Sequence, residues 1–548
     1  MISSSLVHFT LLALGIGSSY AVPSPRAIPT VTLDKGVFSG VLDGNTNKFL
    51  GIPFAKPPTG DLRFRLPVPN DPYTGTHSAS DFGPSCPQQP PKLPIPGNLA
   101  AEAVNFIVDT AFNAVFPSSE DCLTVNVWAP SSIPAGQKLP VVAWIFGGGF
   151  ELGSTSMYDG GVIVKRSIAL GEPVIYVSMN YRVTAFGFLA SKEVKAAGVG
   201  NIGLQDQREA FRWIQKYINA FGGDPTKVTI WGESAGAISA ALHMVTNGGN
   251  TEGLFRGAFM QSGSPIPVGD ITHGQKFYDA IVAETGCSSA SDTLQCLREV
   301  PFDTLMDAVN DSPGIFAYQS LALSWLPRAD GTFLTAPPQQ LMLQGSVANI
   351  PFVTGDCDDE GTLFALSSLN VTTESQLRTY ITSQFIPDAA KSDIDKLLSL
   401  YPADITQGSP FDTGIFNALT PQYKRIAAML GDLVFQSARR LFLQTRSSKQ
   451  NTWSFLNKRL KALPALGSAH ATDILNIYGG GDMADFLIHF VNYLDPNGAS
   501  GSTWPKYTTS SPQLMTFVDG ATPRKITTDN FRADAMAFVQ ELALDNPI

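Results

Sequence analysis

Ser234 stands between two glycines in the stretch "VTIWGESAGAISAA", residues 228–241. A β-branched run precedes the serine and a small, apolar run follows it, so we expect a strand to end and a helix to begin there. A nucleophilic serine at such a corner needs a sharp turn. Gly232 and Gly236 remove the side chains that would collide with neighbouring elements. The same pattern also occurs in ordinary glycine-rich turns, but directly after a buried strand it predicts a nucleophile elbow.

A serine hydroxyl becomes a good nucleophile only when a neighbouring base takes its proton, and histidine is the usual base. The chain has six histidines. We favour His470 because it lies in "PALGSAHATD", a loop of small residues from which its ring could reach outward. His489, in contrast, is embedded in the apolar run "FLIHFVNYL", which is typical of a core position.

The histidine in turn needs an acid that fixes its tautomer and stabilises the imidazolium. The stretch "PFVTGDCDDEGTLF" follows an expected strand and carries Asp356, Asp358, Asp359 and Glu360. From the residues alone any of these could serve, and a solvated acidic turn is the alternative. The order serine, acid, histidine is that of an α/β-hydrolase.

Acyl transfer also requires hydrogen-bond donors for the oxyanion that develops on the substrate. The glycine-rich loop "IFGGGFELGS" follows the apolar run "LPVVAW" and offers backbone N–H groups that no side chain obstructs. We expect Gly148, Gly149 and the amide of Ala235 to form a three-donor oxyanion hole. A glycine triplet is otherwise only a flexible turn.

Apolar runs that read as strands alternate with helical stretches along the chain, which predicts crossover connections and a large, mostly parallel sheet. In such sheets, functional residues collect at the carboxyl ends of the strands. No low-complexity linker or repeat divides the chain of 548 residues. We therefore expect a single domain over residues 22–548.

The composition excludes some classes of partner and indicates a secreted protein. The net charge is −10 and no basic cluster occurs, which argues against binding to nucleic acid. Residues 1–21 read as a signal peptide cleaved after Ala21, and no later apolar run is long enough to span a bilayer. Asn310 in "NDS" and Asn370 in "NVT" are then candidate glycosylation sites.

Together with several further segments, these residues make the chain resemble a known family, the type-B carboxylesterases and lipases, which includes the cholinesterases. Within it, the chain is most similar to the Candida rugosa-type yeast lipases. The resemblance extends from about residue 30 to the C-terminus and rests on "EDCLTVNVW", "FGGGFELGS", "MNYRV", "NIGLQDQREAFRWI", "FGGDPTKVTIWGESAGA", "MQSGS", "DEGT" and "PFDTGIFNALTPQYKRIAAMLGDL".

The resemblance implies an α/β-hydrolase fold, with helices on both faces of the sheet, and a secreted serine ester hydrolase. It favours a triacylglycerol lipase that works through an acyl-enzyme at a lipid–water interface, with no metal or organic cofactor. It assigns the acid to Glu360 and agrees with His470 as the base. The implied oxyanion donors are those expected above: Gly148, Gly149 and Ala235.

The five cysteines allow several pairings on spacing alone. Cys287 and Cys296 are close enough in the sequence to close a local loop. Cys86 and Cys122 would then bracket an insert. The resemblance implies the bridges Cys86–Cys122 and Cys287–Cys296, which leaves Cys357 free.

By the same resemblance, the insert 86–122 is a disulfide-anchored lid over the active site. Its apolar stretch "LAAEAVNFIVDTAFNAVF" reads as a helix, and an ordinary helix packed on the core is the alternative. The insert contains neither Trp nor Tyr. Cholinesterases place an aromatic residue there to hold a quaternary ammonium, so the comparison with that branch of the family does not predict a choline ester as the preferred substrate. The residues that could share the apolar helix face are Ala103, Phe106, Ile107, Thr110 and Ala114.

The segment "PGIFAY", residues 313–318, resembles the lining of the acyl tunnel in these lipases. Ile315 and Phe316 are thus candidate acyl-chain contacts, or else ordinary core residues. A sterol esterase or a non-lipolytic carboxylesterase of the same fold remains an alternative, and a non-catalytic binding module is a more distant one. A monomer and a weak dimer are both compatible with the sequence.

Overall fold

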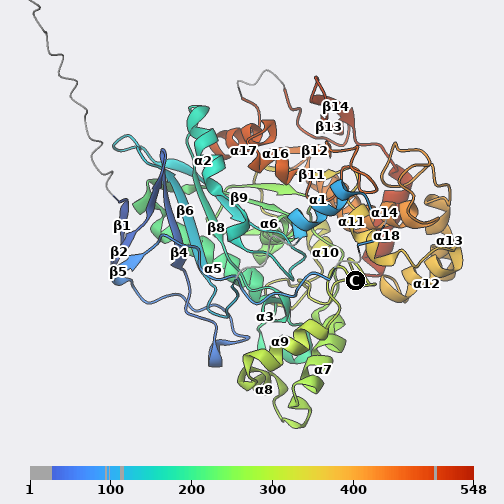
Figure 1. The fold of residues 1–548 in the computed structure, drawn as a ribbon, viewed down its shortest axis with the longest axis horizontal. Coiled ribbons are helices and arrows are strands. Elements are labelled where there is room, and N and C mark those ends of the chain that lie inside the picture. The colour runs from blue at the N-terminus through green and yellow to red at the C-terminus, as the bar shows by residue number, and fades with distance from the viewer. Residues whose placement is uncertain (1–27, 93–94, 98, 112–116, 499–502) are drawn as a thin grey trace, which may run out of the picture.

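The computed structural model describes residues 28–548 except 93–94, 98, 112–116 and 499–502. The predicted signal peptide at residues 1–21 therefore lies outside the described residues. A sheet of 11 strands runs through the molecule (Figure 1). From edge to edge its strands are β14 (Arg524–Thr528), β13 (Gln513–Val518), β12 (Thr452–Lys458), β11 (Phe352–Cys357), β10 (Gly257–Gln261), β9 (Gly223–Glu233), β7 (Leu139–Ile145), β8 (Ile175–Met179), β6 (Thr124–Pro130), β4 (Thr46–Pro53) and β3 (Val41–Asp43).

The centre of this sheet is parallel and its margins are antiparallel. Strands β8, β7, β9, β10, β11, β12 and β13 run parallel to one another, whereas β14, β6, β4 and β3 pair antiparallel with their neighbours. All residues of β7, β8, β10 and β11 are buried. Parallel strands covered on both faces read as continuous apolar runs, which is why the sequence indicated them. The prediction of a mostly parallel sheet is confirmed.

A second, small sheet consists of β1 (Thr30–Leu33), β2 (Lys35–Ser39) and β5 (Thr74–Ser78). It lies at the side of the molecule where the described chain begins (Figure 1). It makes no contribution to the strand ends that carry the predicted site residues.

Helices cover both faces of the large sheet (Figure 1). Helices α5 (Ile202–Tyr217) and α6 (Ala235–Val245) pack on each other and on β9, and α2 (Gly160–Ala169) packs on β8 and on α17 (Asp482–Tyr493). The other α-helices are α1 (Ala101–Ala111), α3 (Thr184–Phe188), α4 (Lys192–Ala197), α7 (Gln275–Glu284), α8 (Thr293–Glu299), α9 (Phe302–Asp311), α10 (Pro338–Leu343), α11 (Thr362–Ala365), α12 (Glu374–Gln384), α13 (Lys391–Leu400), α14 (Tyr423–Gly431), α15 (Ser437–Arg446), α16 (Ile474–Tyr478) and α18 (Ala533–Asp545).

Two disulfides link the chain, Cys86–Cys122 and Cys287–Cys296, as the resemblance implied. Cys357 is free and buried at the end of β11. Across the described part of the chain, no helix has the combined length and apolar character that crossing a membrane requires.

Candidate active site

Ser234 occupies the sharp corner between β9 and α6, as the glycine pattern predicts. Its backbone lies at φ 53° and ψ −123°, a strained conformation for a residue with a side chain. A Cβ on Gly232 would lie 2.3 Å from the carbonyl carbon of Gly236, and a Cβ on Gly236 would lie 2.0 Å from the carbonyl oxygen of Ile145. Only glycine therefore allows β9, α6 and the end of β7 to approach so closely around the serine.

The structure brings Ser234, His470 and Glu360 together in one chain of hydrogen bonds. His470 Nε2 lies 2.8 Å from Ser234 Oγ, and His470 Nδ1 lies 2.5 Å from Glu360 Oε2. The three side chains come from loops after three parallel strands of the large sheet, β9, β11 and β12, and all three residues are buried. The ring of His470 also packs on Phe364 and Phe435.

The four acidic residues after β11 have different partners, which the sequence alone left open. Asp356 pairs with the buried Arg439 at 2.8 Å. Asp358 and Asp359 both pair with Lys461. Only Glu360, among these four, reaches His470. None of the four is a solvated acidic turn residue, because all are buried.

Two further groups hold the Glu360 carboxylate, and sequence reasoning missed both. Ser262 Oγ and the backbone N–H of Cys357 each donate to Glu360 Oε1 at 2.6 Å. Oε1 is the oxygen that His470 does not use. The position of Ser262 directly after the expected strand "GAFMQ" was the one signal that could have indicated it. Cys357 thus contributes its amide, while burial raises the pKa of its thiol and keeps it inert.

Glu233, the residue before the nucleophile, is also part of this buried cluster. Its Oε1 lies 3.4 Å from His470 Nε2. Burial raises the pKa of Glu233 to about 8. Burial disfavours the imidazolium of His470, but the carboxylates of Glu360 and Glu233, with Asp473 behind them, outweigh it and raise the pKa of His470.

The glycine-rich loop after β7 lies against the serine. A Cβ on Gly147 would be 2.9 Å from the Cβ of Ser234. Gly148 and Gly149 have φ values of 114° and 62°, which L-residues with side chains rarely adopt. Gly148 and Gly149 line a cavity at Ser234, and Ala235 lines the adjoining one, which also reaches Ser234. The three expected oxyanion donors are thus grouped around the nucleophile.

Residues 28–538 match the carboxylesterase family. The chain belongs to this family. Lipase 2 of Diutina rugosa is 47% identical to it over 543 residues, 96% of this chain and 97% of that protein. The secreted triacylglycerol lipase LIP1 of Gibberella zeae is 41% identical over 544 residues, 95% of this chain and 92% of that protein. Among solved structures, EstA of Aspergillus niger superposes with a TM-score of 0.81 at 27% identity, over 96% of this chain and all of that one.

The protein is therefore a carboxylic ester hydrolase with an α/β-hydrolase fold. Within the described residues of this carboxylesterase, no cluster of His, Cys, Asp or Glu side chains is arranged to hold a metal ion.

The cavities of the carboxylesterase at Ser234 are strongly apolar. Ile315 lines both cavities that reach Ser234, and Phe316 lines one of them. Both residues are 7% exposed, so they also belong to the core. Ile315 Cδ1 would lie 2.5 Å from a Cβ on Gly149, which brings the cavity wall into contact with the expected oxyanion loop.

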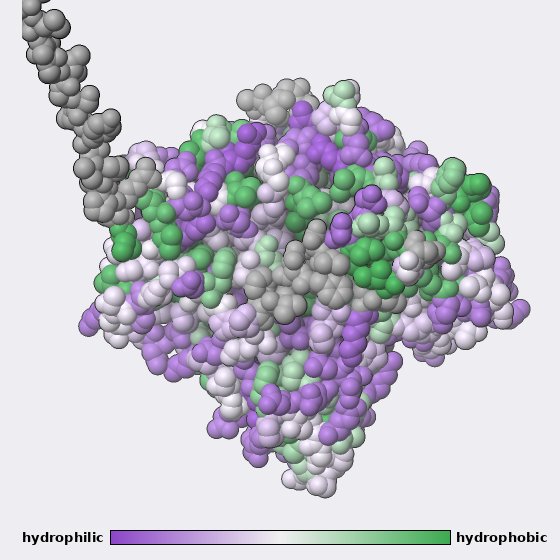
Figure 2. Space-filling model, in the orientation of Figure 1, coloured by the Kyte–Doolittle hydropathy of each residue, from purple (hydrophilic) through white to green (hydrophobic). Residues whose placement is uncertain are grey.

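The insert between Cys86 and Cys122 carries α1, whose apolar face points inward. Ala103 and Ile107 are fully buried and Phe106 packs partly against the core. The other two residues proposed for this face fall outside the description, Ala114 entirely and Thr110 in its side chain. In the view of Figure 2, an apolar area lies where Figure 1 shows α1 and α11.

The two candidate glycosylation sites differ in exposure. Asn370 is exposed between α11 and α12. Asn310 is half-buried near the end of α9, and its side-chain oxygen is enclosed without a hydrogen-bond partner.

Proposed function

We propose that this carboxylesterase is a secreted triacylglycerol lipase with Ser234 as nucleophile, His470 as general base and then general acid, and Glu360 as the acid that orients the histidine. The observation that carries this proposal is the continuous hydrogen-bonded chain from Ser234 through His470 to Glu360, set beside an apolar cavity. The named activity of the relatives supports triacylglycerols as substrates.

In the proposed reaction, Ser234 Oγ attacks the ester carbonyl while His470 Nε2 takes its proton. The amides of Gly148, Gly149 and Ala235 donate to the oxyanion of the tetrahedral intermediate. His470 then protonates the departing alcohol and an acyl-enzyme remains. Water, deprotonated by His470, attacks the acyl-enzyme and releases the fatty acid.

The fatty acyl chain is proposed to lie along Ile315 and Phe316, and the insert 86–122 is proposed to act as a lid. The buried apolar face of α1 supports the lid: if α1 moved outward, Ala103 and Ile107 would be exposed and could contact lipid.

The first test is the initial rate on tributyrin at concentrations that pass through its solubility limit, with Ser234→Ala as control. We expect a rise in rate once droplets appear, and no activity in the variant. Saturation below the limit without a rise would instead identify a non-lipolytic carboxylesterase. A fluorophosphonate should label the parent protein and not Ser234→Ala. An unlabelled, inactive parent would favour a binding module, and a sterol ester assayed in parallel tests the sterol esterase.

The lid is tested with two variants of the same helix. Ile107→Ser should reduce the rise at the droplet surface, because it weakens the apolar face, while hydrolysis of dissolved tributyrin stays close to that of the parent. Glu102→Gln, on the exposed side of α1, is the matched control and should leave both rates unchanged. An equal rise in rate at the droplet surface in the two variants would contradict the proposal that the apolar face of α1 contacts lipid.

Secretion is proposed from the N-terminal apolar segment and from relatives named as secreted lipases. N-terminal sequencing of protein from the culture medium should begin after Ala21. Removal of N-glycans should lower the mass of the secreted protein. Asn370→Gln should remove the part of this change in mass that comes from a glycan at the exposed site. Asn310→Gln shows in the same way whether the half-buried site carries a glycan.

A further inference from the structure

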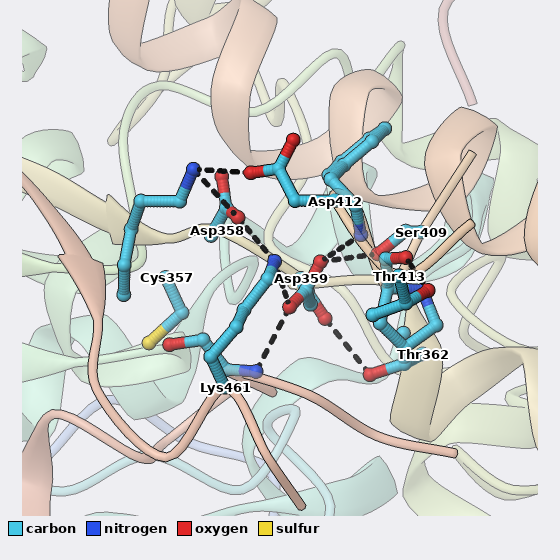
Figure 3. Close-up of polar contacts among 12 residues, drawn as sticks. Cys357, Asp358, Asp359, Thr362, Ser409, Asp412, Thr413 and Lys461 are labelled. Carbon is cyan, nitrogen blue, oxygen red and sulfur yellow. Dashed lines mark hydrogen bonds and ion pairs between the residues drawn. The ribbon is translucent and has the colours of Figure 1, made fainter. Parts of the chain in front are cut away.

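Asp359 lies directly before Glu360 and connects three segments of the molecule that are far apart in the sequence. It is fully buried. Figure 3 shows its carboxylate between Lys461 on one side and Ser409 on the other. A buried carboxylate is costly unless donors and a counter-charge satisfy it, so the identity of its partners indicates what it holds together.

Each carboxylate oxygen of Asp359 accepts two hydrogen bonds. Oδ1 accepts from Ser409 Oγ at 3.0 Å and from the N–H of Phe411 at 2.8 Å. Oδ2 accepts from the N–H of Ser468 at 2.8 Å and from Lys461 Nζ at 2.6 Å. The carboxylate thus joins the turn that carries Glu360, the loop at residues 409–413 and the loop that carries His470.

Backbone contacts add to the link with the histidine loop. The N–H of Asp359 donates to the carbonyl of Ser468 at 3.0 Å. Thr362 Oγ1 donates to the carbonyls of both Asp359 and Leu466, at 2.9 and 2.8 Å. Gly467 has a φ of 61°, and a Cβ there would lie 2.3 Å from Asp359 Oδ2. The histidine loop therefore has no side chain at the point where it meets the carboxylate.

We propose that Asp359 is a positioning residue that sets the distance between His470 and Glu360. It holds the backbone of Ser468, two residues before the histidine, against the backbone of the residue before Glu360. The 2.5 Å contact between His470 Nδ1 and Glu360 Oε2 then follows from a fixed separation of the two loops. A carboxylate is suited to this task because its two oxygens can accept from several donors at once.

The adjacent residue Asp358 provides a contrast within the same cluster. Asp358 is buried and pairs with Lys461 and with Lys458, so it shares the positive charges. Its carboxylate reaches the histidine loop through the Lys461 side chain, and among the described residues it has no hydrogen bond to Ser468. The two aspartates therefore separate the effect of charge in this cluster from the effect of holding Ser468.

The test is Asp359→Asn, with Asp358→Asn as the matched control. The side-chain amide that the first substitution introduces has one acceptor oxygen in place of two, so it cannot accept from the donors on both sides. We expect kcat on a dissolved ester to fall by about 100-fold with little change in KM, because small displacements of catalytic groups have costs of this order. Asp358→Asn should retain most of the parent's kcat.

A pH profile distinguishes positioning from a general structural role. The carboxylates of Glu360, Glu233 and Asp473 face His470, and Glu360 is the nearest. If the two loops separate in Asp359→Asn, His470 loses part of this interaction, and the acid limb of kcat/KM should move to lower pH. A variant that is only less stable would show the parent's profile at temperatures where it is folded.

Thr362→Val is the second variant, for the case in which Asp359→Asn does not fold. It keeps the carboxylate and removes the hydroxyl that bonds the carbonyls of Asp359 and Leu466, so a smaller fall in kcat and a smaller shift of the acid limb in the same direction are expected. An unshifted profile in whichever of the two variants folds would overturn the proposal, as would an equal loss of kcat in Asp358→Asn.

The inference rests on the proposed roles of Ser234, His470 and Glu360, and the two can fail separately. Activity that survives in Ser234→Ala would refute Ser234 as the nucleophile, whatever the activity of Asp359→Asn. An inactive Ser234→Ala together with an unchanged Asp359→Asn would refute only the positioning role.

Discussion

Ser262 Oγ donates a hydrogen bond to Glu360 Oε1 at 2.6 Å, and Glu360 Oε2 lies 2.5 Å from His470 Nδ1. The two oxygens of the Glu360 carboxylate thus have different partners. Ser262 holds the carboxylate from the end of β10, while His470 approaches from the loop after β12. The orientation of the histidine therefore depends on a hydroxyl that does not touch it.

Ser262→Ala is expected to lower kcat by about 10- to 100-fold, since a hydrogen bond to a charged group contributes about 1.5–3 kcal/mol. The amide of Cys357 would still hold Oε1, so activity should not be lost entirely. Ser264→Ala is the matched control, because Ser264 is buried in the same segment and bonds Thr354 instead. The measurement is kcat on a soluble p-nitrophenyl ester, and equal rates for the two variants would contradict this role.

Activity is expected to rise with pH through the pKa of His470. The neutral imidazole is the form that can accept the proton of Ser234, and protonation on the acid side removes it. Burial lowers this pKa, but Glu360 and Glu233 outweigh burial and raise it above the ordinary value of about 6.5. The midpoint of kcat/KM for a soluble ester, measured from about pH 5 to 10, should therefore lie above about 6.5. A profile that is flat through the acidic range would exclude His470 as the base.

Phe316→Trp should lower kcat/KM for long-chain esters more than for butyrate esters, because added bulk fills the apolar cavity at Ser234. A difference of one methylene in an apolar pocket changes selectivity by about 10- to 200-fold, which sets the scale of the expected effect. Phe277→Trp is a control outside this cavity. The ratio of kcat/KM for the two chain lengths is the readout, and an unchanged ratio would place the acyl chain elsewhere.

Asp529→Asn is expected to destabilise the fold by about 3–5 kcal/mol at neutral pH, because it removes the carboxylate that pairs with the buried Arg440 and leaves the buried Arg439 with Asp356. Asp529 lies 3.1 Å from Arg439 and 2.6 Å from Arg440. Burial opposes ionisation, but these two arginines hold the pKa of Asp529 well below its usual range.

The pH dependence of this effect follows from the sign of the shift. A depressed pKa stabilises the folded state above the unfolded pKa of about 3.9, and this contribution is lost as pH falls toward the folded pKa. The difference in unfolding free energy between parent and Asp529→Asn should thus shrink below about pH 4. Urea unfolding at several pH values measures it. Asp307→Asn, on the exposed side of α9, should match the parent throughout.

Local patterns in the sequence were sufficient to predict the buried strands, the sharp turn at Ser234 and the glycine-rich loop after β7. Continuous apolar runs such as "LPVVAWI" become buried parallel strands because both of their faces are covered. The glycines around Ser234 are required by contacts within a few residues of the turn and with the adjacent strand end. His470 was also a candidate from the sequence, since its loop of small residues differs from the apolar surroundings of His489. In the structure, His489 is buried and pairs with the half-buried Glu172.

The residues by themselves did not decide which carboxyl group reaches the histidine or what holds it there. The family resemblance pointed to Glu360, and the tertiary structure supplies the physical reason. The sequence shows four neighbouring acidic residues that differ little in chemistry. In the structure, Asp356 pairs with Arg439, Asp358 and Asp359 pair with Lys461, and Glu360 pairs with His470. The partner of each depends on the direction of a side chain at the end of β11 and on chain segments about a hundred residues away in sequence. The role of Ser262 could not be predicted from the sequence for the same reason. Ser262 comes close to Glu360 only because β10 and β11 pair side by side in the sheet.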